Sequence, residues 1–492
     1  MDTGAIRSKK KVTSLYIHSL IVLALMFGFG YLPPIGGVTQ LGMHAIGIFL
    51  GSIWGWCFVS LGWPSVMGLI AIGLSGYMSM NETLAAAFGA SSTIQVFVIL
   101  IFVAYMTRSG LSEYIARMIL GSKICLGRPW MLVFIILFCS WVVSSATNAI
   151  PGTLLVWGFV YGALEECGFT KKDKFTTVIL FLILTTALVG ALTMPYNVTP
   201  LIFINGLTQS TGYTINYLSF FIGRCVCGLG FIVIMMLVVR FVIRPDLSKL
   251  VNKTDVFIEA RKGLKMNVEQ KIAAFCCLLF LATIFIPANL PKEWPVVTFF
   301  NNLGLIGCGI LIIIGATIIH LYQVKNKGYK SIMDTNLLIK DLSWDIIFVL
   351  ALTVPLTNFL SDDKCGVFDI FMSFFGPLAE NVGPIPFVII SVLFSGIVTQ
   401  LTHNQVLAAV LIPIVCPVAM DLGINPVAMM MCMMLPIQVA VCTPSASTVA
   451  AMGFGNDKWV DVKLAFIIAF ICFLTTAVYS VLSLPIFLIF FN

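Results

Sequence analysis

Two stretches of this chain, about 250 residues apart, each place an asparagine between two apolar segments. The first reads SSATNAIPGTLLV around Asn148 and is followed by GALTMPYNVTP, which contains Thr193. The second reads TQLTHNQVLAAVLIPI around Asn404 and is followed by VCTPSASTVAAMG, which contains Thr443. Amides, hydroxyls and unwound backbone can hold an anion or coordinate a cation, because such backbone has free N–H and C=O groups. The two stretches therefore predict a polar binding site within an apolar chain.

The residues expected to form this site lie at two Asn-centred tips and in the two polar breaks that follow them. For an anionic substrate we expect Thr147, Asn148, Thr193, His403, Asn404, Gln405, Thr443 and Pro444. For sodium ions, which need several oxygen ligands, we expect Ser144, Ser145, Asn148, Thr402, Asn404 and Ser445. The same stretches also offer Tyr196, Asn197, Thr199, Gln400 and Ser447. Each hydroxyl has an alternative, a bond back to its own helix; the two asparagine amides cannot be satisfied so locally.

Acidic residues are absent from the expected site. All 21 Asp and Glu residues can be placed in loops or interfaces, whereas proton pumps usually carry an intramembrane carboxylate. This favours sodium coupling, or gradient-driven exchange, over a carboxylate-based proton antiporter. His403 could titrate near neutral pH, but a neutral hydrogen-bonding role at the tip is the favoured interpretation. Arg224 is expected to snorkel or to pair structurally, with a substrate role as the alternative.

The composition is that of a polytopic membrane protein. Hydrophobic residues make up 59% of the chain and charged residues 10%, against about 25% charged in soluble domains. The 14 Cys are scattered through apolar segments, without the spacing of a zinc site or a disulfide framework. The net charge of +7 is dispersed among short loops, so it does not indicate a nucleic-acid partner. The apolar run near the N-terminus is interpreted as a retained first span.

We expect one all-α membrane domain over residues 1–492, an inverted repeat with two re-entrant helical hairpins and two discontinuous transmembrane helices. The first repeat core is 92–207, with a hairpin at 129–164 and a broken helix at 175–207. The second is 344–452, with a hairpin at 384–417 and a broken helix at 426–452. Hydropathy predicts about eleven spans, at 14–33, 40–60, 63–78, 92–107, 175–207, 215–243, 271–289, 295–322, 344–360, 426–452 and 463–490.

Charge indicates how the chain is oriented. With the N-terminus in the cytoplasm and the C-terminus outside, all but three of the 28 Lys and Arg fall on the cytoplasmic side, as the positive-inside rule requires. The exceptions are Arg224, Lys292 and Lys364. Apolar residues at helical spacing also predict an amphipathic helix in the membrane interface before each hairpin. The two stripes are Leu111, Tyr114, Ile115, Met118 and Ile119, and Val367, Ile370, Phe371, Phe374 and Phe375.

The chain resembles the divalent anion/sodium symporter family, which includes di- and tricarboxylate carriers. Members carry a Ser-Asn-Thr motif at each hairpin tip and a Thr-Pro-containing break after it. HNQVLAAVLIPI, from His403, resembles the second motif, and CTPSAS, from Cys442, the second break. Thr147-Asn148-Ala149 is the better counterpart of the first motif, with Ser144-Ser145-Ala146 as the alternative. Both tips depart from Ser-Asn-Thr, at the groups that meet substrate and sodium in the family.

The resemblance implies a homodimer with a scaffold region and a moving transport region. We therefore expect sodium-coupled uptake of a small organic anion, such as a C4 dicarboxylate, by an elevator-type alternating-access mechanism. A sodium-independent anion exchanger is the alternative, and no cofactor is expected besides the coupling sodium. A membrane enzyme and an ATP-driven pump are disfavoured, because the sequence has neither HExxH nor a Walker A motif. A channel stays open as a further alternative, and the two halves are expected to play equivalent roles.

Overall fold

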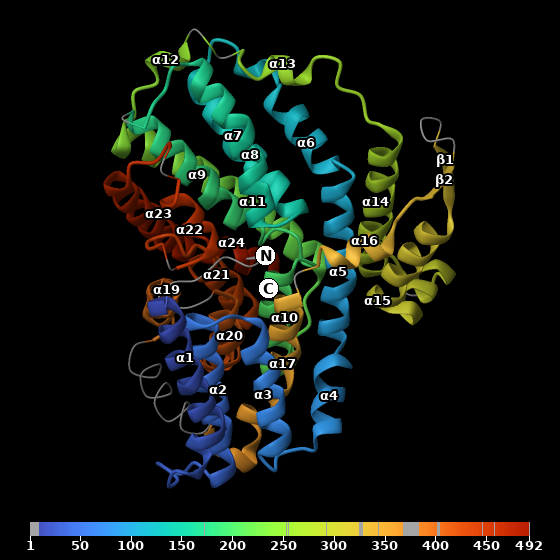
Figure 1. Ribbon diagram of the computed structural model, residues 1–492, viewed down its shortest axis with the longest axis vertical. Coiled ribbons are helices and arrows are strands. Elements are labelled where there is room, and N and C mark those ends of the chain that lie inside the picture. The colour runs from blue at the N-terminus through green and yellow to red at the C-terminus, as the bar shows by residue number, and fades with distance from the viewer. Residues whose placement is uncertain are drawn as a thin grey trace. The chain divides into compact units, whose positions relative to one another are not determined.

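The chain is almost entirely helical in the computed structural model (Figure 1). The structure describes residues 9–171, 173–251, 253, 255–291, 293–323, 328–342, 344–367, 383–400, 404–444, 446–456 and 458–491. Contacts divide the chain into two compact units. Unit 1 comprises Met1–Phe97, Ser343–Phe387 and Ala409–Gly423, and unit 2 comprises Val98–Leu342, Val388–Ala408 and Ile424–Asn492.

Unit 1 is built from the first four helices, from α17 and from the C-terminal part of α20 (Asn404–Asp421). Its helices are α1 (Lys9–Leu23), α2 (Gln40–Phe58), α3 (Gly62–Leu74), α4 (Met80–Phe88) and α17 (Trp344–Ser361). The start of α4 is fixed by a capping box, in which Ser79 and Glu82 satisfy each other's backbone N–H groups. Buried polar groups find partners across helices, since Trp56 Nε1 donates to Ser65 Oγ at 2.8 Å. The ring of Tyr77 stacks on that of Phe359, with centroids 4.2 Å apart.

The first half of unit 2 contains the first hairpin and the first broken helix. Its helices are α5 (Ser91–Arg108, which begins in unit 1), α6 (Leu111–Leu120), α7 (Pro129–Ala146), α8 (Ala149–Glu166), α9 (Lys174–Gly190) and α10 (Val198–Thr211). Glycines let α7 lie against its two neighbours, because a Cβ at Gly152 would collide with Ser144 and one at Gly190 with the Trp141 carbonyl. Every α9 residue from Phe175 to Gly190 is buried.

The same order of elements recurs later in the chain. It consists of α19 (Pro384–Val398), α20 (Asn404–Asp421), α21 (Pro426–Gln438) and α22 (Thr448–Phe454). Residues 401–403 of the second tip lie outside the described part of the chain. All thirteen residues of α21 are buried, including its Met-rich run, whose flexible side chains fill a core readily. The predicted all-α architecture is therefore confirmed, and the described residues show the same order of helices in both halves.

The remaining helices frame unit 2 or connect its parts. They are α11 (Tyr217–Val238), α12 (Ser248–Val251), α13 (Ile258–Arg261), α14 (Val268–Asn289), α15 (Pro295–Ile318), α16 (Thr335–Lys340), α23 (Val462–Leu482) and α24 (Leu484–Phe491). Short π or 3-10 turns occur at Ala24–Gly28, Phe29–Tyr31, Lys123–Cys125, Val239–Ile243 and Asp363–Cys365. The sequence did not indicate the small antiparallel pair of β1 (His320–Gln323) with β2 (Gly328–Ser331). The span expected at 295–322 therefore ends at Ile318.

Six described helices are long and apolar enough to cross a membrane, and α4 with α5 forms one further bent pair at 43°. The last expected span, 463–490, is divided at Ser483 into α23 and α24. Eleven spans remain a prediction, because several other apolar helices are shorter than a full crossing.

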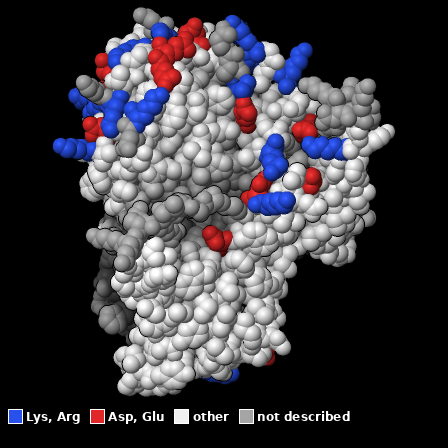
Figure 2. Space-filling view, viewed as in Figure 1, with Lys and Arg blue, Asp and Glu red and all other residues white. Residues whose placement is uncertain are grey.

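Basic side chains gather at one end of unit 2, over α12 and α13, with acidic side chains among them (Figure 2). There the Lys249 ammonium donates to both carboxylate oxygens of Asp173, at 2.8 and 2.9 Å. This bond lowers the pKa of Asp173, and Asp173 in turn accepts from the Thr170 backbone just before α9. The charged loop thus ties the α8–α9 connection to the stretch that carries α12.

One predicted surface helix is present, but it presents a different face to the protein. In α6 the buried residues are Leu111, Ser112, Ala116 and Leu120. The predicted stripe is only partly covered, and Met118 is 42% exposed. Leu111 of the stripe is buried and Tyr114, Ile115 and Ile119 are half-buried, so only Met118 is exposed. The second predicted stripe lies outside the described residues, except for Val367.

Candidate functional site

The first tip is the two-residue joint between α7 and α8. Thr147 ends α7, and its hydroxyl donates back to the Val143 carbonyl at 2.7 Å. Asn148 is fully extended and begins α8, with its Oδ1 accepting from the Ala149 N–H at 2.7 Å. The amide nitrogen of Asn148 makes no hydrogen bond within the described part of the chain. The tip therefore caps one helix with an oxygen and leaves the two N–H donors of the same amide free.

The first break is tied to this tip by Asn197. The residue precedes α10, but its side chain does not cap that helix. Its Nδ2 donates instead to the carbonyls of Ser145 and Ala191, at 3.0 and 3.1 Å. The N-terminus of α10 is thus held beside the tip with no side chain on its first N–H groups.

A small cavity lies where these two helix starts meet. Its volume is about 10 Å³, which is roughly the space that one water-sized species needs. Helix N-termini carry partial positive charge and unpaired N–H groups, so this corner suits an anionic oxygen. The cavity is lined by Ile99, Leu100, Val103, Thr147, Asn148, Ala191, Asn197, Val198 and Thr199.

The second tip reaches the same cavity through one side chain. Gln405 Nε2 lies 3.5 Å from the hydroxyl of Thr199, which lines the cavity. Asn404 begins α20 as Asn148 begins α8, and its Oδ1 accepts from the Gln405 N–H at 3.2 Å. Its amide nitrogen, however, donates to the Gln438 side chain at 3.0 Å. The two asparagines therefore have matching positions and different bonding.

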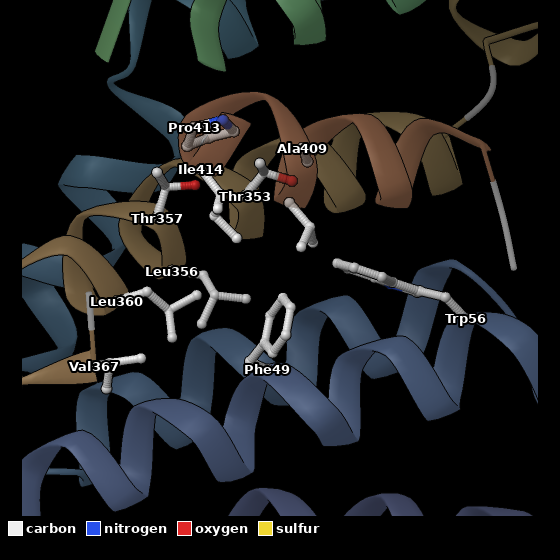
Figure 3. A pocket seen from close by; sticks show the side chains of 11 residues that line it. Phe49, Trp56, Thr353, Leu356, Thr357, Leu360, Val367, Ala409, Pro413 and Ile414 are labelled. Atoms are coloured by element: carbon white, nitrogen blue, oxygen red, sulfur yellow. The ribbon is translucent and has the colours of Figure 1, made fainter. Parts of the chain in front are cut away.

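Unit 1 contains a second cavity, which is apolar. It holds about 60 Å³ and is lined almost entirely by apolar side chains. Figure 3 shows Phe49 and Trp56 of α2 facing Leu356 and Leu360 of α17, with Pro413 of α20 beyond them. No charged side chain lines it. It lacks the convergent donors that an anion requires, so the polar corner in unit 2 is the candidate site.

A family model for the sodium:sulfate symporter transmembrane region matches residues 13–488. The chain belongs to the sodium:sulfate symporter family. It is an integral, multi-pass membrane protein of this family, as its composition predicted.

A sequence relative agrees with the family assignment, and two solved structures share the fold. The sodium-dependent dicarboxylate transporter SdcS of Staphylococcus saprophyticus is 23% identical over 312 residues, or 61% of this chain. The match spans 57% of the length of that relative. The fold is similar to the YdaH transporter of Alcanivorax borkumensis, with a TM-score of 0.54, 12% identity and coverage of 83% of this chain and 87% of that one. It is also similar to MtrF of Neisseria gonorrhoeae, with a TM-score of 0.51, 14% identity and coverage of 98% and 95%.

The structure brings only some of the expected site residues together. Thr147 and Asn148 line the cavity, and Gln405 contacts its wall. Thr193 lies in the first break with a buried hydroxyl that has no partner among the described residues. Thr443 donates to the Gln400 carbonyl at 3.3 Å, and Pro444 beside it is exposed.

The structure does not bring the expected sodium ligands together among the described residues. Ser145 bonds back to the Trp141 carbonyl at 2.9 Å, which is the local alternative for a membrane hydroxyl. The Ser144 side chain packs against Gly152, inside the hairpin. Thr402, His403 and Ser445 lie outside the described residues.

The sequence did not indicate the hydrogen bonds that two polar residues make at the two tips. Asn197 ties the first break to its tip, and Gln438 holds the second asparagine. Gln438 carries a sequence signal, because it is the polar residue that ends an otherwise apolar, Met-rich helix.

The expectation that Arg224 snorkels was wrong. Its side chain does not snorkel, because the residue is 1% exposed. Its Nε and Nη1 have no partner among the described residues. The guanidinium lies inside unit 2, where α11 packs against α7, α23 and α24.

Proposed function

We propose that this chain is a sodium-coupled carrier for small organic anions, with C4 dicarboxylates as the expected substrate class. The observation that carries the proposal is the polar corner where the N-termini of α8 and α10 meet and the amide of Asn148 is free. Such donors hold a carboxylate without a buried arginine or lysine next to it. The name of the relative SdcS, a sodium-dependent dicarboxylate transporter, supports the same class.

Sodium is the expected partner of this anion for an electrostatic reason. Moving an uncompensated carboxylate through a low-dielectric region is costly, and a cation bound nearby offsets that cost. The membrane potential then contributes about 2.3 kcal/mol per net charge at 100 mV. A sodium-independent anion exchanger is the second candidate, because Thr147-Asn148-Ala149 has lost one hydroxyl of the family motif.

Transport proceeds by alternating access of the elevator type in this proposal. The moving part is the region that carries both tips, and the whole of residues 1–492 acts as one transporter domain built on two repeat cores. The protein is a homodimer with its N-terminus in the cytoplasm and its C-terminus outside. The basic side chains over α12 and α13 support the cytoplasmic assignment of that end (Figure 2).

Uptake into proteoliposomes tests the function. We expect labelled succinate or malate to accumulate when an inward sodium gradient is imposed, and to stop accumulating when choline replaces sodium. Accumulation that needs only internal unlabelled anion would instead establish the exchanger. If succinate, malate, citrate and sulfate all fail to enter under both conditions, the proposed substrate class is wrong.

A further inference from the structure

A groove lies between α13 and the turn that follows α6, at the end of unit 2 where basic side chains gather (Figure 2). Its volume is about 520 Å³, against about 10 Å³ for the cavity at the first tip. The two elements approach closely, because a Cβ on the buried Gly121 would collide with the Cβ of Arg261. The groove therefore lies at a packed junction of two elements that are far apart in the sequence.

The charged side chains that line this groove are all basic. They are Lys123, Arg261 and Lys262, and none of the lining residues is acidic. Lys123 and Arg261 are exposed and form no ion pair with a carboxylate among the described residues. Lys249 at the same end has such a partner in Asp173. The groove thus offers two cations whose charge no described carboxylate offsets.

Apolar side chains border these cations. Ile124 and Ile258 line the groove, and Ile124 is 58% exposed. Leu126 in the same turn is 47% exposed, and Met118 in α6 is 42% exposed. A soluble phosphate makes no use of exposed apolar side chains, whereas a phospholipid has acyl chains next to its charged headgroup. The surroundings of the cations therefore favour a lipid over a soluble anion.

The groove is also in a position to meet the membrane surface. The sequence predicts α6 to be a helix of the membrane interface, and α6 leads directly into the turn that carries Lys123. In the orientation proposed above, Lys123 and Arg261 lie on the cytoplasmic side. The cytoplasmic leaflet carries anionic lipids, and basic pockets between helices on that side bind their headgroups.

We propose that this groove binds an anionic phospholipid of the cytoplasmic leaflet, with Lys123 and Arg261 on the phosphate and Ile124 against the acyl chains. The lipid joins the connection before α7 to the loop that carries α13. This site is distinct from the polar corner at the first tip, because the 18 residues of α7 separate the two by about 27 Å. The proposal does not depend on which anion is transported.

Native mass spectrometry of the purified full chain in detergent tests the site. The protein is titrated with dioleoylphosphatidylglycerol, and separately with dioleoylphosphatidylcholine, whose headgroup has no net charge. We expect one phosphatidylglycerol per chain to bind in preference to phosphatidylcholine. The double variant Lys123→Gln/Arg261→Gln should bind phosphatidylglycerol about 25-fold more weakly, at about fivefold for each cation removed.

The matched control is the double variant Arg128→Gln/Lys265→Gln, which removes two exposed cations from the same two connections. Neither residue lines the groove, so binding of phosphatidylglycerol should be unchanged. Equal weakening in the control would show attraction to diffuse surface charge and overturn the proposed site.

Two further outcomes would also overturn the proposal. One is equal binding of the two lipids by the wild type. The other is displacement of phosphatidylglycerol by glycerol 3-phosphate, which would make a soluble phosphate the ligand. Size-exclusion chromatography shows whether each variant is folded; if the double variant is not, Lys123→Gln alone, with an expected weakening of about fivefold, decides the question.

Discussion

Asn148 uses one side of its amide for structure and leaves the other free. Its Oδ1 caps α8, while its Nδ2 has no partner within the described residues. Asn404 uses both sides, since its Nδ2 is held by Gln438. Two residues at matching positions therefore differ in what they can offer a ligand.

This difference gives a prediction for Asn148→Ser. Serine caps a helix about as well as asparagine, so the midpoint of thermal unfolding should change little. The variant removes the free N–H donors, and a hydrogen bond to a charged group contributes about 1.5–3 kcal/mol. Uptake at low substrate should fall about 10- to 150-fold.

The matched control for that variant is Asn216→Ser, at the exposed N-cap of α11. It makes the same chemical change far along the chain from the tip, and uptake should be unaffected. Equal losses in the two variants would show that capping, and not the free amide, explains the effect.

Arg224 gives a second prediction at this scale. A buried guanidinium with two nitrogens unpartnered among the described residues is destabilising. Replacing it by Met, which has similar length and no charge, should stabilise the protein by about 1–4 kcal/mol. Thermal unfolding in detergent micelles measures this, with Arg240→Met, at an exposed position, as the control. A lowered unfolding temperature would mean that Arg224 binds a polar group in the membrane.

The packing of α7 against α8 depends on Gly152, and its packing against α9 depends on Gly190. A Cβ at Gly190 would collide with the Trp141 carbonyl, which is backbone and cannot rotate away. This contact sets how closely the first hairpin lies against the first broken helix. The geometry of the first break therefore depends on a helix contact as well as on the polar residues in the break itself.

Gly190→Ala should consequently destabilise the protein, by about 1–3 kcal/mol as for other overpacked positions. Gly158→Ala in α8 is the matched control, because nothing lies within 4 Å of a Cβ there. That change should be neutral or stabilise by up to about 1 kcal/mol. Thermal unfolding of both variants tests the contact, and equal effects would show that the α7–α9 approach is not limiting.

At the scale of the whole molecule, the distribution of Lys and Arg predicts how the chain is oriented in the membrane. The helix packing carries no information on this orientation. We expect Lys171, after the first hairpin, to face the cytoplasm and Asp421, after the second, to face outward. Single cysteines at these positions should react differently with an impermeant maleimide. Lys171→Cys should be labelled only in permeabilised cells, and Asp421→Cys in intact cells. Labelling of both positions from one side would contradict the opposed hairpins and the inverted repeat.

Much of the fold could be predicted because it depends on local composition. Apolar runs defined the helices, and Pro, Thr and Asn marked the interruptions, since unwound backbone within a membrane requires polar partners. The end of α15 at Ile318 was missed, although the polar residues His320 and Gln323 follow it in β1. Arg224 was expected to reach water, but the sequence of one span does not show whether neighbouring helices bury a side chain in it.

The sequence by itself determined that the chain is a membrane protein, where its tips and breaks lie, and that the two halves share an order of elements. These properties depend on residues close together along the chain. Only the tertiary structure decided which groups are already satisfied, because the partners are far apart in sequence: Gln400 bonds to Val439, Val441 and Cys442, and Gln405 reaches Thr199. Matching motifs therefore do not imply matching sites, since a hydrogen-bond donor supplied by a distant residue can occupy the oxygen that an ion would need.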